Sequence, residues 1–166
     1  MQMLNWFSYK INFYLNGLKL RALSFELRRF PRILETVRFG PDVKLIGPND
    51  SISIGHHTYI NEAIITAGYG AEVIIGKQCA IGYRVSIKAV THDIDTPHPD
   101  ECGRVINIGK TIQIGDYCWI GDNVYIREGV SIGSKVIVGA NSVVTRSIPE
   151  GCVVAGAPAR QIRDFL

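Results

Sequence analysis

His92 is the residue whose position in the sequence points most directly to chemistry, because an irregular polar stretch begins immediately after it. A histidine side chain has an unperturbed pKa of about 6.5, so an imidazole can accept a proton at neutral pH and return it later. Residues 93–107 are rich in Asp, Pro and Glu, and a long loop leaving a regular scaffold is usually functional. We predict that His92 is a general base. The alternative is a surface histidine at a strand end, as we expect for His56, His57 and His98.

The scaffold that positions His92 is a repeat of six residues. From residue 108 an aliphatic residue returns at every sixth position: Ile108, Ile114, Ile120, Ile126, Ile132, Val138 and Val144. Glycine follows five of the seven: Gly109, Gly115, Gly121, Gly133 and Gly139. Four positions after each aliphatic residue stands a small or β-branched one: Ile112, Cys118, Val124, Val130, Val136 and Ser142. An earlier block, Ile75, Ile81 and Ile87, has the same spacing, and a weaker copy begins at Ile54.

A period of six fits neither an α-helix nor simple strand alternation. It fits a short strand followed by a turn, with the aliphatic side chain inside. Three such units form one triangular coil, and a coil can bury its apolar side only when it is stacked on others. The sequence therefore predicts a mainly β protein, a left-handed parallel β-helix over residues 41–156. The interruption of the repeat predicts an inserted loop at 93–107, with His92 on the last ordered position of the coil before it.

The two ends of the chain depart from the repeat. Residues 1–40 carry seven Lys/Arg and two Asp/Glu, and their leucines and aromatic residues recur at helical spacing. We predict an amphipathic helical segment that covers the open end of the β-helix. Peripheral contact with a membrane is the alternative, given the aromatic residues beside the lysines and arginines. Residues 157–166 are predicted to form a C-terminal cap.

Composition limits the class of protein. The 166 residues are 46% hydrophobic and 20% charged, with a formal net charge of +3, which is typical of a globular domain. The four cysteines form no CxxC pair, so we expect reduced thiols, with Cys79 and Cys118 in the core. The sequence shows no secretory signal and no apolar run long enough to span a membrane. We expect a cytoplasmic protein that does not bind nucleic acid.

Several motifs resemble the hexapeptide-repeat acyltransferases, in particular the branch containing maltose and galactoside O-acetyltransferases. The resemblance covers residues 50–163. It rests on Thr91-His92, on the stretches 114–121, 129–133 and 138–146, on Ile148-Pro149 and on Ala155-Gly156-Ala157-Pro158-Ala159-Arg160. A weaker similarity links the N-terminus to small acetyltransferases of surface-polysaccharide biosynthesis. The resemblance implies a homotrimer with three active sites between neighbouring β-helices, and acetyl-CoA as the donor.

Roles for individual residues follow from this resemblance. His92 matches the catalytic histidine, and Trp119 matches an aromatic residue beside the thioester and the acceptor. The expected donor-binding residues are Trp119, Asp122, Ala140, Ser142, Thr145, Arg146, Arg160 and Arg163. Small residues let the extended pantetheine lie against the coil, and guanidinium groups suit phosphate oxygens. A backbone N–H near Gly121-Asp122 is the candidate for holding the oxyanion.

The acceptor side matches the family less well. Asn61 corresponds to an asparagine near the acceptor, although the alignment could equally put Ala63 there. The family's acidic helical segment is missing, and Gly68-Tyr69-Gly70 replaces the acidic residues expected after the early coil. The Gly-Gly-Thr-Gly stretch of serine acetyltransferases is also missing. Asp93 or Asp95 could orient the imidazole, and the sequence does not choose between them.

Our prediction from the sequence is therefore an acetyl-CoA-dependent O-acetyltransferase that acts on a saccharide hydroxyl and needs no metal. N-acetylation of an amino sugar and a non-catalytic binding or scaffold protein are the alternatives. A metal-dependent carbonic anhydrase on the same scaffold would need three histidines at one metal. The sequence has no histidine after His98 and lacks that spacing.

Overall fold

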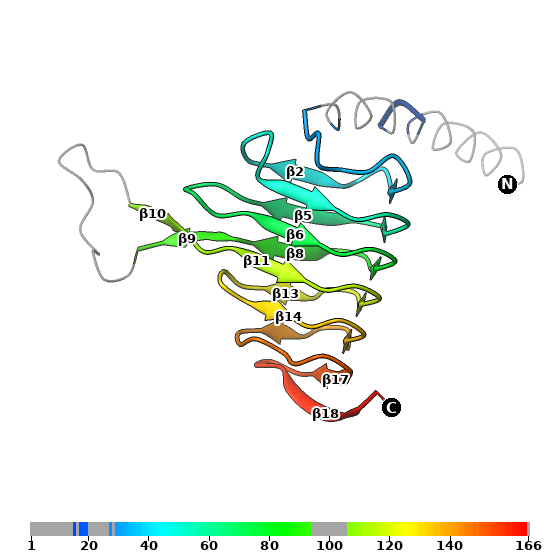
Figure 1. Cartoon of the computed structure of the whole chain (residues 1–166), viewed down its shortest axis with the longest axis vertical. Coiled ribbons are helices and arrows are strands. Elements are labelled where there is room, and N and C mark those ends of the chain that lie inside the picture. The colour runs from blue at the N-terminus through cyan, green and yellow to red at the C-terminus, as the bar shows by residue number, and fades with distance from the viewer. Residues whose placement is uncertain (1–14, 16, 20–26, 28, 94–105, 166) are drawn as a thin grey trace, which may run out of the picture.

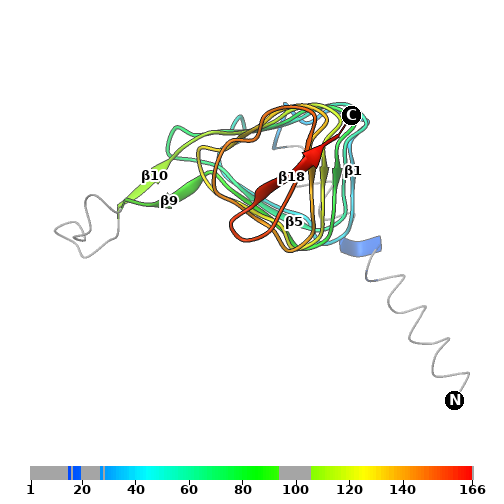
Figure 2. The same cartoon turned by 90° about the horizontal axis from the view of Figure 1, so that it is seen from below.

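The computed structural model describes residues 15, 17–19, 27, 29–93 and 106–165. Short strands in three parallel sheets wind around one axis, which gives a tapering column with a triangular cross-section (Figures 1 and 2). The protein is a left-handed parallel β-helix, as the six-residue repeat predicts. We call the three sheets walls A, B and C, in the order in which the chain visits them.

Each wall is a ladder of strands from successive coils. Wall A contains β3 (Ile52–Ile54), β6 (Val73–Ile75), β11 (Ile112–Ile114) and β14 (Ser131–Ile132). Wall B contains β1 (Arg38–Phe39), β4 (Tyr59–Ile60), β7 (Ala80–Ile81), β12 (Trp119–Ile120), β15 (Ile137–Val138), β17 (Cys152–Ala155) and β18 (Arg160–Asp164). Wall C contains β2 (Lys44–Ile46), β5 (Ala63–Thr66), β8 (Val85–Lys88), β13 (Tyr125–Ile126) and β16 (Val143–Val144).

The aliphatic residues of the repeat fill the interior in three columns. The column from wall A is Ile54, Ile75, Ile114 and Ile132; that from wall B is Ile60, Ile81, Ile120, Val138 and Val154; that from wall C is Ile65, Ile87, Ile126 and Val144. All of them are buried. Burying one such side chain contributes about 1.5–3 kcal/mol, so the regular register accounts for most of the core.

The corners between the walls are equally regular. Where wall A turns into wall B (the AB corner), and where wall B turns into wall C (the BC corner), one residue of the turn adopts a left-handed conformation. These residues are His57, Gln78, Tyr117 and Lys135 at the AB corner, and Arg84, Asn123 and Asn141 at the BC corner. A residue in the left-handed region lets the chain bend sharply from one wall to the next. Asn123 and Asn141 also bond to each other across two coils, Nδ2 to Oδ1 at 2.9 Å. Successive corners therefore stack on one another.

The third corner, from wall C to wall A (the CA corner), is interrupted by a hairpin. Strand β9 (Val90–His92) pairs antiparallel with β10 (Asn107–Gly109), and both project away from the column on the side opposite wall B (Figure 2). The coil closes behind them, since the Lys110 N–H donates to the Ala89 carbonyl oxygen at 2.9 Å. The inserted segment thus begins at Val90, before the predicted 93–107, and His92 lies on the hairpin instead of on the coil. The sequence-based bounds differ because Thr91 and Ile108 keep the six-residue spacing although they lie on the hairpin, outside the coil.

The ends of the column differ. At the C-terminal end β18 reverses direction, pairs antiparallel with β17 and lies across the last coil (Figure 2). At the other end, helical residues are described at 15, 17–19 and 27, and the Lys19 ammonium lies 2.6 Å from the Asp42 carboxylate. The rest of the predicted amphipathic segment, and with it the predicted membrane contact, lies outside the described residues. Within the described residues, no helix has the length and apolar character to cross a membrane.

Candidate functional site

His92 ends strand β9, and its side chain is exposed. In the register of the hairpin it lies opposite Asn107, and the His92 Nδ1 is 2.9 Å from the Asn107 Oδ1. A ring nitrogen held in this way orients the imidazole and leaves Nε2 available for a substrate proton. A general base needs both features. Asp93, one of the two acidic residues predicted to orient the ring, also has an interaction partner, and Asp95 lies outside the described residues.

Asn107 is a residue that sequence reasoning missed. Its Nδ2 donates a hydrogen bond to the Tyr69 Oη at 3.1 Å, so the amide bridges Tyr69 and His92. Tyr69 belongs to the Gly68-Tyr69-Gly70 turn of a preceding coil. The signal in the sequence was slight: Asn107 is a polar residue directly before Ile108, at the point where the repeat appeared to resume.

Trp119 lies on the outer face of wall B, where 56% of it is exposed. Its neighbours on the same face are Ala80 on β7 and Ile137 on β15. Wall B is the side of the triangle opposite the hairpin (Figure 2). One chain therefore does not bring Trp119 and His92 together.

Three of the predicted site residues stack at the BC corner. Asp122 and Ala140 follow β12 and β15 in successive turns, and the Asn141 N–H donates to the Asp122 carbonyl oxygen at 2.8 Å; Asn61 follows β4, two coils before β12. Ala140 is exposed and lies next to Gly156 of the last coil. In the last coils Gly121, Gly139, Ala140 and Gly156 form a column of small residues at this corner. An extended chain can lie close to the backbone along such an edge.

The carboxylate of Asp122 already has a structural role in the fold. Its carboxylate Oδ1 accepts the Tyr83 N–H at 2.8 Å, which joins two turns of the BC corner. The neighbouring Gly121 N–H donates to the Val138 carbonyl oxygen at 2.8 Å. Of the two N–H groups predicted for an oxyanion, the one on Gly121 is therefore already used.

The structure gives the side chain of Ser142, a predicted donor-binding residue, a structural role. The residue is fully buried; its Oγ donates to the Gly139 carbonyl oxygen at 2.6 Å and accepts the Gly156 N–H at 3.0 Å. A ligand on the outside of the coil cannot reach this hydroxyl. The inward position of Ser142 in the repeat was the signal for a structural role.

The remaining predicted donor residues lie elsewhere. Thr145 and Arg146 follow β16 at the CA corner, and Arg146 is exposed there. Arg160 and Arg163 are exposed on β18 and pair with Ala155 and Val153 of wall B. Arg160 therefore lies close to the Ala140 column, whereas Arg146 shares its corner with the hairpin.

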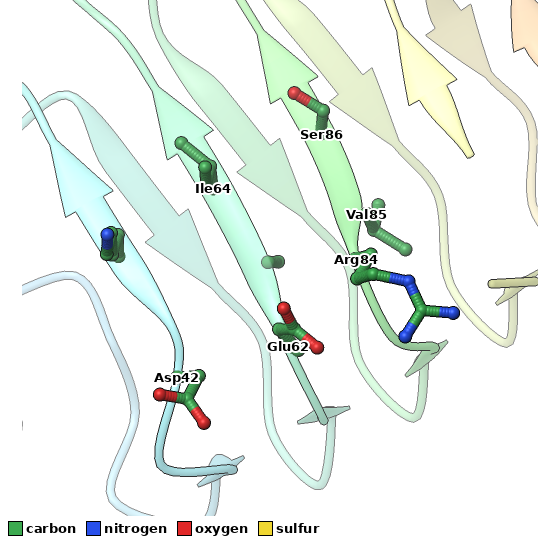
Figure 3. Close-up of a pocket in the computed structure, with 8 residues that line it drawn as sticks. Asp42, Glu62, Ile64, Arg84, Val85 and Ser86 are labelled. Carbon is green, nitrogen blue, oxygen red and sulfur yellow. The ribbon is translucent and has the colours of Figure 1, made fainter. Parts of the chain in front are cut away.

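A shallow pocket of about 320 Å³ lies on the outer face of wall C (Figure 3), and Asn61 directly precedes one of its lining residues, Glu62. Its lining residues are Asp42, Lys44, Glu62, Ala63, Ile64, Arg84, Val85 and Ser86. Glu62 and Arg84 lie at the BC end of their strands, and Ile64 and Ser86 lie further along wall C (Figure 3). Carboxylates beside an apolar surface can bind a hydroxyl-bearing molecule.

Comparison with known proteins agrees with this geometry. A family profile described as "Bacterial transferase hexapeptide (six repeats)" matches residues 111–146. A hexapeptide-repeat-containing acetyltransferase from Vibrio cholerae O1 biovar eltor, crystallised with acetyl coenzyme A, is similar at 30% identity and a TM-score of 0.72. The alignment covers 92% of this chain and 85% of that one. This chain belongs to the hexapeptide-repeat acetyltransferase family.

Two further solved structures of sugar acetyltransferases resemble this acetyltransferase. A maltose O-acetyltransferase from Clostridium difficile 630 is 28% identical with a TM-score of 0.71, over 84% of this chain and 73% of that one. A galactoside acetyltransferase in complex with coenzyme A is 30% identical with a TM-score of 0.63, over 78% of this chain and 64% of that one. A comparison with curated protein sequences finds no match.

The described cysteines of this acetyltransferase are not placed for covalent catalysis. Cys79, Cys118 and Cys152 are free thiols and all are buried. Its hydrogen bond with Cys79, together with burial, raises the pKa of Cys118 far above its usual value, so this thiol stays protonated and unreactive. Among the residues that the structure describes, no group of three or more His, Cys, Asp or Glu side chains could hold a metal ion.

One ion pair helps to fix the CA corner. Glu128 is 9% exposed, and its carboxylate accepts hydrogen bonds from the Arg127 guanidinium. Burial alone raises the pKa of Glu128, but the hydrogen bonds and positive charge of Arg127, with a contribution from Lys110, outweigh burial and lower it. Glu128 is therefore charged at neutral pH, close to the base of the hairpin.

Proposed function

We propose that this acetyltransferase transfers the acetyl group of acetyl-CoA to a hydroxyl group of a saccharide, with His92 as general base. The observation that carries the proposal is the exposed imidazole of His92 on a hairpin, with Nδ1 held by Asn107. Among the similar structures, one was crystallised with acetyl coenzyme A, one with coenzyme A, and one is a maltose O-acetyltransferase. These similarities support the donor and the saccharide class of the acceptor.

The reaction requires one proton to move twice. The Nε2 lone pair of His92 removes the proton of the acceptor hydroxyl as its oxygen attacks the thioester carbonyl carbon. The tetrahedral intermediate then collapses, the C–S bond breaks, and the protonated His92 returns the proton to the thiolate. The products are the acetyl ester and coenzyme A. Positioning of both substrates and hydrogen bonds to the oxyanion supply the rest of the acceleration.

We also propose that the working site lies in a cleft between two copies of the chain, within a homotrimer. The support is that His92 projects from the CA corner, whereas Trp119 and the column of Ala140 lie on wall B and the BC corner of the same chain (Figure 2). A neighbouring copy is needed to bring these two sets together. The side chain of Tyr59, 45% exposed beside Ala80 of wall B, adds apolar surface for such packing.

The donor and acceptor are proposed to lie against different residues. The pantetheine chain follows the small residues around Ala140, with Asp122 and Trp119 beside it and Arg160 and Arg163 near the phosphates. Thr145 and Arg146 complete this donor set. The saccharide lies between Asn61, with the pocket around Glu62, and the imidazole of His92. Free thiols at Cys79, Cys118 and Cys152 support a reducing, cytoplasmic location, and the acceptor class fits a role in polysaccharide biosynthesis.

The experiment that tests the activity is release of free thiol from acetyl-CoA by the purified protein, with a panel of neutral sugars, amino sugars and oligosaccharides. Thiol release that depends on a neutral sugar, with an ester product identified by mass spectrometry, is expected. If the only products are amides of amino sugars, the proposed O-acetylation is wrong and the activity is N-acetylation. If the protein binds acetyl-CoA but transfers no acetyl group, it is a binding protein and the proposed activity is wrong.

A mixing experiment tests the shared cleft. We expect His92→Ala chains, which lack the base, and Ala140→Trp chains, which bind acetyl-CoA weakly, to give more activity when they are co-assembled than when they are assayed separately at a low acetyl-CoA concentration. A cleft that combines His92 of one copy with Ala140 of another is intact in some of these mixed trimers. A site within one chain would give no recovery, and the mass of the assembly in solution shows whether three copies are present.

A further inference from the structure

The environment of His92 contains a second feature, which joins two segments far apart in the sequence. The Asn107 amide lies between the His92 imidazole, with Oδ1 at 2.9 Å from Nδ1, and the Tyr69 phenol, with Nδ2 at 3.1 Å from Oη. Tyr69 comes from the turn of an earlier coil, 38 residues before Asn107. The three side chains therefore form a continuous chain of hydrogen bonds from the column to the hairpin.

The chemistry of an amide gives this chain a direction. An asparagine Oδ1 only accepts hydrogen bonds and its Nδ2 only donates them. With Nδ2 donating to the phenol oxygen of Tyr69, Oδ1 is turned towards His92, and the contact at 2.9 Å requires a proton on Nδ1. A neutral imidazole carries one proton, so Nε2 keeps its lone pair. That is the tautomer a general base needs.

The phenol is itself held in a defined position. Tyr69 adopts a left-handed conformation (φ 53°) in a turn closed by hydrogen bonds between Gly68 and Ala71, at 3.1 and 3.0 Å. This turn packs directly on the base of the hairpin at Gly109. A Cβ added there would lie 2.4 Å from the Gly68 carbonyl oxygen and 2.7 Å from the Ala71 Cβ. Only glycine permits so close an approach, which keeps the phenol within reach of Asn107.

We infer that Asn107, held by Tyr69, is a positioning residue that fixes His92 as the tautomer with a proton on Nδ1 and a free Nε2. This inference rests on the proposed role of His92 as general base. It gives the Gly68-Tyr69-Gly70 turn a function. It also assigns the orientation of the imidazole to a neutral amide, whereas the sequence-based prediction considered only Asp93 and Asp95. Because the amide is uncharged, it orients the ring without adding a negative charge beside it.

The tautomer is measured directly by NMR on the full chain with 15N-labelled histidine, at a pH where the imidazoles are neutral. His92→Gln identifies the His92 signals by their loss. We expect a protonated Nδ1 and an unprotonated Nε2 in the native protein, and a mixture of tautomers in Asn107→Ala. A protonated Nε2 in the native protein would overturn the inference.

Kinetics provide the second readout. Asn107→Ala is expected to lower kcat about 10- to 100-fold, by analogy with the loss of the hydrogen-bond partner of a metal-ligating histidine, with the KM for acetyl-CoA unchanged. Asn107→Asp keeps the acceptor oxygen and is expected to restore most of the turnover. Tyr69→Phe is expected to give a smaller loss, because the ring still packs beside Asn107. The control is Ile106→Ala, which removes an exposed side chain of the same segment and should keep native turnover.

The outcomes separate the two proposals. Native turnover in Asn107→Ala overturns the role of Asn107 whatever the substrate is. Equal losses in the Ala and Asp variants would indicate a purely structural role and also overturn it. If no acetyl transfer is found at all, the proposed function fails, while the NMR measurement still reports whether Asn107 selects the tautomer.

Discussion

The BC and CA corners of this β-helix are built from the same repeat but differ in their regularity. At the BC corner the turns that begin at Gly82, Gly121 and Gly139 have the same length and stack in register, with the Asn123–Asn141 bond joining two of the coils. At the CA corner the chain leaves the coil after Ala89, forms a hairpin and returns at Lys110. The first corner presents a uniform edge, and the second presents a single histidine on a projecting strand.

This difference separates two tasks. An edge with small residues suits binding of a long, extended substrate, because the substrate can approach the backbone closely. A reactive group must instead occur once and in a fixed orientation, which repetition cannot supply. In the proposed site this group is His92 on the hairpin, and the contact between Gly109 and the turn of Gly68 and Tyr69 anchors the hairpin to the column. Changes at the two corners should therefore affect different kinetic constants.

The largest expected effect is on turnover at the CA corner. His92→Ala should lower kcat about 10²–10⁴-fold, the usual contribution of general acid–base catalysis, while binding of acetyl-CoA measured by calorimetry stays native. His56→Ala is the matched control, because His56 is an exposed histidine of the AB corner, where its Nδ1 contacts the Thr36 Oγ1 at 3.0 Å. Near-native turnover in His92→Ala would end the proposed role of this residue.

The corresponding change at the BC corner should act on the donor. Ala140→Trp puts a bulky ring on the column of small residues, and crowding of about 1–3 kcal/mol corresponds to a roughly 5- to 150-fold rise in the KM for acetyl-CoA. Glu150→Trp carries the same bulk at the AB corner and should leave this KM unchanged. A native KM in Ala140→Trp would remove the BC corner from the donor site.

Gly109→Ala tests the anchor of the hairpin. The new Cβ would meet the Gly68 carbonyl oxygen at 2.4 Å, so the turn or the hairpin must move. We expect unfolding free energy to fall by about 1–3 kcal/mol, as for other overpacked sites, together with a loss of turnover. Urea denaturation and the thiol-release assay measure the two effects. Gly17→Ala, where nothing lies within 4 Å of an added Cβ, is the control and should show neither loss.

Ser142→Ala distinguishes structure from donor binding within the regular part of the column. Its loss leaves the Gly156 N–H without its partner, so stability should fall by about 1–3 kcal/mol while affinity for acetyl-CoA remains native. Urea denaturation and calorimetry on the same preparation measure both quantities. A weaker affinity with native stability would restore Ser142 to the donor site and contradict its buried position.

The smallest expected effect concerns pH at the CA corner. Because Arg127 lowers the pKa of Glu128 below the usual 4.5, this pair stabilises the fold above that pH, and the contribution is lost as the pH falls through the lowered pKa. The urea midpoint of Glu128→Gln should therefore depend less on pH in this acidic range than that of the native protein. Parallel curves for the two proteins would show that the pair contributes nothing to acid stability.

Much of the scaffold could be predicted because the position of a residue within the six-residue repeat determines whether its side chain points into the core. Ile114, Ile120 and Ile126 are buried as predicted, and so are Cys79 and Cys118 in the small positions. The structure departs from the sequence-based expectation where one local pattern fits two structures. Thr91 and Ile108 keep the spacing of the coil but belong to a hairpin, and Ser142 fits both a core position and a ligand contact.

The sequence alone determined the β-helix, its inward columns and the location of His92 beside a break in the repeat, since all three depend on periodicity along the chain. Only the tertiary structure decided that Asn107 bridges His92 and Tyr69, and that His92 and Trp119 lie on opposite sides of one chain. The reason is physical: the contacts of Asn107 depend on the pairing register of the hairpin and on its packing against another coil. The spacing of residues along the sequence specifies neither the register nor this packing.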